Sequence, residues 1–149
     1  MINIIFWGRG GEGAKTASHI LAEAAFSENK EVQAFPEYGP ERSGAPMRSY
    51  VKISDTKIKN QSSITIADYI IFIDGSLIKQ TSLEKDIFKN ANKNTKFIVN
   101  SKTIQELNYS CKSINASEIS IKYFGKDFSN IVLLGALVKL TGVVKLESL

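Results

Sequence analysis

Blocks of apolar residues alternate with polar segments along the chain, and their spacing predicts a β-α-β order. A short apolar run over 3–7 predicts the first strand, and apolar residues at helical spacing over 13–27 predict the helix that follows it. Further strands are expected at 31–35, 47–53, 69–73, 96–99 and 111–116. The run over 69–73 is apolar throughout, as is typical of a parallel strand covered on both faces.

Helices are expected between and after the later strands. The sequence predicts three helical segments, at 76–90, 117–124 and 130–140. Ser76 is expected to cap the first of them, and Gly142 to end the last. Because the last segment is apolar nearly all round, we expect the sheet to cover one side of it and another body, such as a second subunit, to cover the other. Residues 57–59 are expected to return beside the preceding strand as a β-hairpin.

This order of elements predicts a three-layer α/β sandwich with a mostly parallel, Rossmann-like sheet and a β-hairpin insertion. We expect a single domain over residues 1–149, because a chain of 149 residues fits one hydrophobic core. In such sheets the loops that face a ligand gather at the carboxyl ends of the strands. Here those loops are 8–13, 36–46, 74–76 and 100–102, and we expect them along one edge of the molecule.

The first of these loops contains four glycines, Gly8, Gly10, Gly11 and Gly13. Glycine permits positive φ and close backbone approach, and the start of a helix presents free N–H groups and the positive end of a dipole. This opening can therefore receive an anionic ligand. The spacing Gly8-x-Gly10-x-x-Gly13 fits the dinucleotide fingerprint, but the spacing alone does not identify the ligand.

Composition and charge narrow the classes of function. Apolar residues make up 43% and charged residues 23% of the chain, both ordinary for a soluble globular protein. The 19 Lys and Arg against 15 Asp and Glu give a net charge of +4, but they form no basic stripe interleaved with aromatic residues, so nucleic-acid binding is not expected. The N-terminus does not resemble a signal peptide and no apolar run approaches the roughly 20 residues of a membrane span, so we expect a cytoplasmic protein without membrane contact.

Few residues of this chain are suited to catalysis or metal binding. Cys111 is the only cysteine, which fits a reducing cytoplasm and excludes a 4Fe–4S cluster held by this chain alone, because such a cluster needs four thiolates. His19, the only histidine, is expected on the wet face of the first helix beside Glu23. No Cys–His or Ser–His pair stands out, so we expect neither a catalytic residue nor a metal ligand in this chain.

The segment 36–46 is the second unusual stretch of the chain. Two glycines and three prolines constrain its path, and charged or hydrogen-bonding side chains project from this rigid frame: Glu37, Tyr38, Glu41, Arg42 and Ser43. A stiff loop loses little entropy when a ligand or partner binds it. The same residues are also consistent with a long turn that carries a local Glu–Arg pair.

Three motifs resemble those of one enzyme family. They are Phe-Trp-Gly-Arg-Gly-Gly-Glu-Gly-Ala-Lys-Thr-Ala over 6–17, Gln-Ala-Phe-Pro-Glu-Tyr-Gly-Pro-Glu-Arg-Ser-Gly-Ala-Pro over 33–46, and Leu-Leu-Gly-Ala-Leu-Val-Lys-Leu-Thr-Gly over 133–142. In order and spacing they closely resemble the gamma subunits of pyruvate:ferredoxin oxidoreductases and, more broadly, the gamma domain of the 2-oxoacid:acceptor oxidoreductases. The family often has Arg or Gly where Ser43 stands and continues beyond Leu149, so we expect a gamma domain shortened at its C-terminus.

The resemblance implies an oxidative decarboxylase assembled from several chains. In this family pyruvate and coenzyme A become acetyl-CoA and CO₂, and electrons pass through 4Fe–4S clusters to ferredoxin or flavodoxin. Thiamine diphosphate and its Mg²⁺ belong to the alpha and beta partners, and the clusters belong to the beta and delta partners. The gamma part is associated with assembly and with closing the coenzyme A side of the site, so this chain alone is expected to be inactive.

The resemblance also implies which residues face the composite site. They belong to the two unusual loops: Gly8, Arg9, Gly10, Gly11, Gly13, Glu41, Arg42, Ser43 and Gly44. Arg9 and Arg42 are candidates for contacts with phosphates of coenzyme A or with acidic groups of a partner, because the planar guanidinium makes bidentate bonds. Structural ion pairs with Glu12 or Glu41 are the equal alternative for these two arginines.

Two other functions stay open on the sequence alone. The first is an independent nucleotide-binding, nicotinamide-dependent oxidoreductase, in which Glu37, 24 residues past Gly13, would hold the ribose hydroxyls. Pro36 and the stiff loop that follows are unfavourable surroundings for that role. The second is a scaffold or regulatory binding module that works without an enzyme partner.

Overall fold

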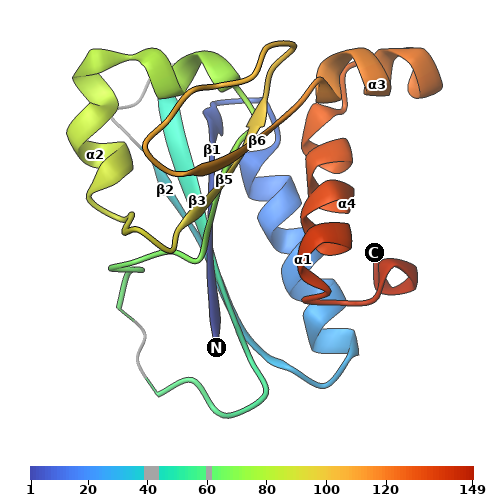
Figure 1. The fold of residues 1–149 in the computed structure, drawn as a ribbon. Coiled ribbons are helices and arrows are strands. Elements are labelled where there is room, and N and C mark those ends of the chain that lie inside the picture. Colours follow the sequence, from blue (N-terminus) through green and yellow to red (C-terminus); the bar gives the residue numbers. More distant parts are fainter. Residues whose placement is uncertain (39–43, 60–61) are drawn as a thin grey trace.

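The computed structural model describes residues 1–38, 44–59 and 62–149, which fold around a six-stranded sheet (Figure 1). The strands are β1 (Ile2–Arg9), β2 (Glu31–Tyr38), β3 (Pro46–Ser54), β4 (Tyr69–Phe72), β5 (Lys96–Asn100) and β6 (Ser110–Ile114). The α-helices are α1 (Ala14–Ser27), α2 (Glu84–Phe88), α3 (Ala116–Phe124) and α4 (Ser129–Thr141). Short 3₁₀ turns are η1 (Gly75–Lys79), η2 (Thr81–Leu83) and η3 (Leu146–Ser148).

The strand order in the sheet is β2-β3-β1-β4-β5-β6. β1 pairs in parallel with β4, β4 with β5 and β5 with β6, whereas β3 runs antiparallel between β1 and β2. The register places Ile4 opposite Tyr69 on one side and opposite Val51 on the other. The sheet is therefore mostly parallel, as expected, and β2 and β3 form the hairpin within it.

The prediction of a return strand at 57–59 is wrong. These residues form no strand, because β3 already pairs with β1 along one edge and with β2 along the other. Strand β2, in contrast, continues past its predicted end at 35, through Pro36 to Tyr38. The sheet tolerates Pro36 because β2 is an edge strand, and one side of an edge strand needs no backbone donor.

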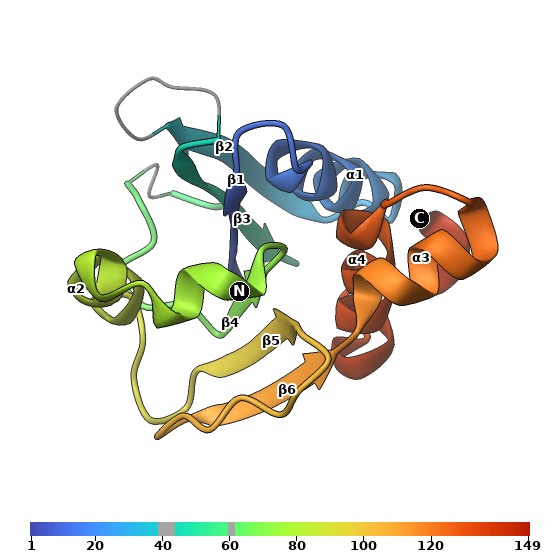
Figure 2. The ribbon, with the colours of Figure 1, turned by 90° about the horizontal axis from the view of Figure 1, so that it is seen from above.

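Alternate residues of β1 face two separate cores. Ile4 and Phe6 pack beneath α1 and α4, whereas Ile5 and Trp7 pack on the opposite face beneath η1 and α2. Figure 2 shows the same division, with α1 and α4 on one side of the sheet and α2 on the other. The expected three layers are confirmed, and burial on both faces explains why the sequence of β1 is a continuous apolar run.

The segment after β4 differs from the helix predicted over 76–90. It contains two 3₁₀ turns and the short α2, because Gln80 adopts an extended conformation with ψ 103° and interrupts the helix. The cap is Asp74 and not Ser76, since Asp74 Oδ1 accepts a hydrogen bond from Ser76 N at 2.9 Å. A carboxylate accepts a backbone N–H more strongly than a hydroxyl does, which favours Asp74 in this role.

Helix α4 begins and ends as the sequence indicates. Asp127 Oδ1 accepts a hydrogen bond from Ser129 N at 2.9 Å, and Gly142 ends the helix with a φ of 62°. The chain then returns to the end of α1, where Glu28 accepts hydrogen bonds from Lys145 N at 2.6 Å and from the Ser148 hydroxyl at 2.7 Å. Within the three described ranges, no helix is long and apolar enough to cross a bilayer.

The replacement Gly75→Ala is expected to destabilise the protein by about 1–3 kcal/mol, which is typical of an overpacked site. A Cβ at Gly75 would lie 2.1 Å from the carbonyl oxygen of Asn100, so the ends of β4 and β5 would have to separate. Gly135→Ala is the matched control, because an added Cβ would meet nothing within 4 Å apart from the neighbouring backbone of its own helix. It should stabilise α4 by about 0.5–1 kcal/mol. Urea unfolding measures both effects, and equal stabilities would contradict the close approach at Gly75.

Candidate functional site

A pocket of about 880 Å³ opens at the carboxyl edge of the sheet. Its walls come from the loops that follow β1, β4 and β5 and from the first turns of α1, α3 and α4. Three of the four loops predicted to meet at this edge line the pocket, through residues 11–13, 74–76 and 100–102. The fourth loop reaches them at Gly44, whose carbonyl oxygen accepts a hydrogen bond from Arg9 Nη1 at 3.2 Å.

The pocket lies where two connections leave the sheet in opposite directions. After β1 the chain enters α1 on one face, and after β4 it enters η1 on the other face. Ligands of open α/β sheets bind at such a switch point, outside the carboxyl ends of neighbouring strands. Sequence and topology therefore both predict a binding site at these two loops.

An ion pair joins these two loops. Arg9 Nε lies 2.6 Å from Asp74 Oδ2, and both side chains are partly buried. Burial by itself would raise the pKa of Asp74, but hydrogen bonds from Ser76 and the Arg9 guanidinium outweigh it and hold the pKa below its usual value. The alternative prediction of an ion pair between Arg9 and Glu12 is wrong, because Asp74 is the acid that lies beside the guanidinium.

Glu12 instead closes the glycine loop from within. Glu12 Oε2 accepts a hydrogen bond from Arg9 N at 2.6 Å, and Glu12 N donates to the carbonyl oxygen of Arg9 at 3.0 Å. Burial is the main cause that raises the pKa of Glu12, and the charge of the neighbouring Asp74 adds to it. A carboxylate of the chain itself thus engages one backbone donor of the loop in which the sequence predicts an anionic ligand.

Asn130, which the sequence pattern does not single out, fixes the far end of the glycine loop. Its Nδ2 donates to the carbonyl oxygen of Gly13 at 3.3 Å. A Cβ on Gly13 would lie 2.3 Å from that nitrogen, and Gly13 also has a positive φ of 85°. Both observations require glycine at this position. The only sequence signal for Asn130 is a polar residue in the first turn of an apolar helix.

Asn100 ties a third loop into the pocket wall. Its amide nitrogen donates to the carbonyl oxygen of Ile73 and to the Ser117 hydroxyl, both at 2.9 Å. Its Oδ1 accepts a hydrogen bond from Ala116 N at 3.0 Å. One side chain therefore links the end of β4, the end of β5 and the start of α3.

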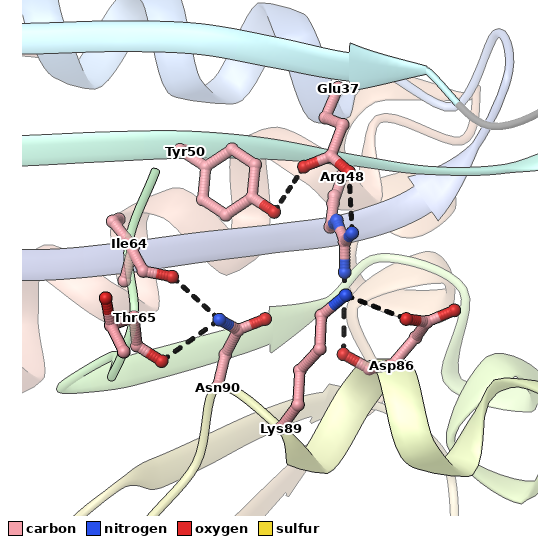
Figure 3. A network of polar contacts seen from close by, with 8 residues as sticks. All are labelled: Glu37, Arg48, Tyr50, Ile64, Thr65, Asp86, Lys89 and Asn90. Atoms are coloured by element: carbon pink, nitrogen blue, oxygen red, sulfur yellow. Dashed lines mark hydrogen bonds and ion pairs between the residues drawn. The ribbon is translucent and has the colours of Figure 1, made fainter. Parts of the chain in front are cut away.

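Of the predicted site residues in the second loop, Gly44 is described, and Glu41, Arg42 and Ser43 lie outside the described residues. The strands that lead into this loop carry a polar cluster (Figure 3). Arg48 Nη2 lies 2.6 Å from Glu37 Oε1, and the Tyr50 hydroxyl donates to Glu37 Oε2 at 2.5 Å. The hydrogen bond from Arg48 is the main cause that lowers the pKa of Glu37, and burial raises the pKa of Tyr50.

The same cluster bears on the nicotinamide alternative. Glu37, the acid that would have to hold the ribose, is engaged by Arg48 and Tyr50. The guanidinium of Arg48 in turn lies 5.2 Å from the centre of the Trp7 ring, a cation–π distance. These contacts hold Glu37 beside β3, so releasing it for a ribose would leave Arg48 without its carboxylate.

The pocket wall combines apolar surface with many polar side chains. Hydroxyl and amide side chains suited to hydrogen bonding line it, namely Thr16, Ser76, Asn100, Ser101, Asn115, Ser117, Ser129 and Asn130. Acids also line it, at Glu12, Asp74 and Asp127, and Lys102 contributes a cation. Among the residues that the structure describes, no three His, Cys, Asp or Glu side chains gather as a metal site requires. The arrangement is suited to holding a polar group or a partner chain by hydrogen bonds.

Residues 3–149 match the family described as pyruvate ferredoxin/flavodoxin oxidoreductase. The chain belongs to this family. The common subunit gamma of the pyruvate/ketoisovalerate oxidoreductases from Thermococcus litoralis is 40% identical, over 99% of this chain and 82% of its own length. The pyruvate synthase subunit PorC from Methanothermobacter marburgensis is 37% identical, over 100% of this chain and 82% of its own length.

Solved structures of similar proteins agree with this family. Pyruvate oxidoreductase subunit PORC from Thermotoga maritima superposes with a TM-score of 0.85 at 35% identity, covering 99% of this chain and 80% of that one. The gamma subunit of a keto/oxoacid ferredoxin oxidoreductase from Geobacter sulfurreducens gives a TM-score of 0.76 at 29% identity, covering 99% and 82%. The resemblance carried by the three sequence motifs is therefore confirmed, and so is the fold class.

The replacement Asp74→Asn should weaken the link between the β1 and β4 loops. At pH 7 we expect it to lower the free energy of unfolding by about 1.5–3 kcal/mol, the range for hydrogen bonds to charged groups. Because folding lowers the pKa of Asp74, its stabilisation is complete above the unfolded pKa of about 3.9 and is lost as the pH falls through the folded pKa. The difference between wild type and variant should therefore be constant above about pH 5 and shrink below about pH 4.

Urea unfolding at several pH values measures this difference. Asp55→Asn, at an exposed turn on the opposite edge of the sheet, is the matched control and should leave the stability unchanged. A difference between wild type and Asp74→Asn that persisted undiminished at pH 3 would show that the charge of Asp74 is not what stabilises the loops.

Proposed function

We propose that this chain is the gamma subunit of a multi-subunit pyruvate:ferredoxin or flavodoxin oxidoreductase. In that role it supports the oxidative decarboxylation of pyruvate with coenzyme A to acetyl-CoA and CO₂, and it is inactive alone. The observation that carries the proposal is the family match over residues 3–149, together with relatives named as gamma or PorC subunits of pyruvate-converting enzymes. These relatives give no support to an independent nicotinamide enzyme or to a scaffold without enzyme partners.

We assign the cofactors of the reaction to partner subunits. Cys111 is the only thiol of this chain, half-buried with a pKa raised by burial, whereas a 4Fe–4S cluster needs four thiolates. The residues present do not fit a cluster. In this proposal the 4Fe–4S clusters, thiamine diphosphate and Mg²⁺ therefore belong to the alpha, beta and delta subunits. Ferredoxin or flavodoxin accepts the electrons, and the complex is located in the cytoplasm.

The two unusual loops are the part of this chain that faces the composite site. The glycine loop contributes Gly8, Arg9, Gly10, Gly11 and Gly13, and the second loop contributes residues 41–44. Two contacts support a common orientation of the loops: Arg9 Nη1 donates to the carbonyl oxygen of Gly44, and Gly10 N donates to that of Ala45 at 3.1 Å. Arg9 thus positions the loops, and Arg42 is the residue that we assign to the phosphates of coenzyme A.

Affinity purification tests the proposed function directly. The tagged chain, isolated from anaerobically grown source cells, is expected to bring down iron–sulfur subunits. The eluate should reduce an artificial electron acceptor only when both pyruvate and coenzyme A are present. If a well-expressed chain is recovered alone and inactive, the proposed function is wrong, and nucleotide binding at the glycine loop becomes the next question.

The replacement Arg42→Ala tests the assignment of the second loop. In the assembled enzyme it should raise the KM for coenzyme A about tenfold or more with little change in kcat, the pattern expected when a charge-assisted contact to bound substrate is lost. Lys93→Ala removes the same charge from an exposed position before β5, at the amino edge of the sheet, and should change neither constant. Steady-state kinetics with varied coenzyme A distinguish the outcomes, and an unchanged KM in the Arg42 variant would remove this residue from the site.

A further inference from the structure

Helix α3 carries its large apolar side chains toward solvent. Ile121, Tyr123 and Phe124 are 53%, 71% and 57% exposed. The buried residues of the same helix are instead the small Ala116 and Ser120. A surface helix of a globular protein usually shows the reverse arrangement, with its large apolar residues on the core side.

The apolar surface continues from α3 to the mouth of the pocket. The ring of Phe128 meets that of Phe124 edge-on, with 6.3 Å between their centres, and Phe128 is itself exposed. Phe128 and Ile131 also line the pocket. We call Ile121, Tyr123, Phe124, Phe128 and Ile131 the aromatic patch. In Figure 2, α3 lies on the outer side of α4, away from the sheet, where a partner has access to it.

Polar contacts fix α3 in this orientation. The Ser120 hydroxyl donates to the carbonyl oxygen of Lys126 at 2.9 Å and accepts from Phe128 N at 2.8 Å. At the start of the helix, Asn115 Oδ1 accepts from Glu118 N at 3.4 Å. A rotation of α3 that buried the aromatic patch would break the two Ser120 bonds, which join the helix to the segment after it, so the fold keeps the patch exposed.

Lysines stand beside the aromatic patch. Lys122 Nζ lies 5.4 Å from the centre of the Tyr123 ring, and Lys126 lies in the turn between Phe124 and Phe128. Both lysine residues are exposed. Two copies of the patch facing one another would bring these like charges together, which disfavours a second copy of this chain as the occupant.

The acids of the same segment are engaged elsewhere. Glu118 Oε2 lies 3.6 Å from Lys102 Nζ. The Asp127 carboxylate accepts from Ser129 N, and hydrogen bonds of this kind lower its pKa against the opposing effect of burial. Glu118 is paired with Lys102, and Lys122 and Lys126 outnumber the ionised Asp127, so this side of the patch has a net positive charge that is complementary to carboxylates.

We propose that the aromatic patch binds a partner subunit of the oxidoreductase. The partner's contact surface is apolar and is edged by carboxylates that face the lysines of this chain. This inference rests on the proposed function, which supplies the partner. Exposed apolar patches of this kind mark interaction sites, and aromatic side chains contribute most of the binding energy of many interfaces. The lysines steer association and set the orientation of the partner. Because Phe128 and Ile131 also belong to the pocket wall, the docked subunit covers the pocket from this side.

The double replacement Tyr123→Ser/Phe124→Ser tests the apolar part of this surface. In affinity purification from source cells, the tagged variant should retain about one tenth or less of the partner subunits that the wild-type chain retains. A loss of this size is expected when central interface aromatics are truncated. Phe26→Ser is the matched control, because Phe26 is an aromatic residue that is 72% exposed at the end of α1. It should retain the partners fully, and circular dichroism with urea unfolding checks that each variant is folded.

The double replacement Lys122→Glu/Lys126→Glu tests the charge of the surface and leaves its apolar side chains in place. Partner retention by the wild-type chain should fall as salt is raised, and the charge-reversed variant should bind weakly at low salt and lose this dependence. Lys57→Glu/Lys59→Glu reverses two exposed charges beyond β3, at the opposite edge of the sheet, and should behave as wild type.

Full retention of the partner subunits by both patch variants would overturn this inference and leave the proposed function intact. A wild-type chain that retains no partner would contradict the proposed function and this inference together. Two further outcomes would overturn the inference alone. One is self-association of the wild-type chain in analytical ultracentrifugation that the aromatic variant abolishes, and the other is patch-dependent binding to phosphatidylserine–phosphatidylcholine vesicles.

Discussion

The burial of β1 on both faces and along both edges fixes the position of everything at the carboxyl edge of the sheet. Ile4, Ile5 and Phe6 have no solvent exposure, and β3 and β4 occupy the two edges of the strand. A shift by one residue would exchange the side chains of the two cores, since strand side chains alternate between faces. The register of β1 is therefore fixed, and Arg9 at its end lies beside the loop that follows β4.

From that point, a few polar side chains tie otherwise separate loops together. Arg9 joins the loop after β1 to Asp74 after β4, and Asn100 joins β4 and β5 to the start of α3. Asn130 then joins α4 to Gly13. Each tie removes freedom from a loop before any ligand or partner arrives, which lowers the entropy cost of binding. A preorganised edge of this kind suits the role that we propose for this chain, a subunit that shapes a site shared with its partners.

The sequence predicted the sheet and its layers well because its signals there are local. The apolar run of β1 and the glycines after it indicated a strand, a loop and a helix in the correct places. The resemblance of three motifs indicated the family. The gathering of loops at the carboxyl edge followed from the parallel order of strands alone.

What the sequence did not predict depends on contacts between distant segments. Both Glu12 and Asp74 could have paired with Arg9, and only the register of β1 against β4 brings Asp74 to its guanidinium. The prediction of a return strand at 57–59 was wrong because β2 pairs with the edge of β3 that this strand would have needed. Asn130 gave almost no signal, because its role depends on the close packing of α4 against Gly13.

The contact between Gly13 and Asn130 also has a consequence for biosynthesis. The two residues are 117 positions apart in the chain, so the glycine loop emerges from the ribosome well before its partner exists. At about 5–20 residues per second, that interval is about 6–23 s. During this interval the glycine loop lacks the Asn130 side chain that fixes its far end. The pocket wall at the carboxyl edge of the sheet is therefore completed only after the start of α4 has been synthesised, and a nascent chain that lacks α4 has an incomplete pocket.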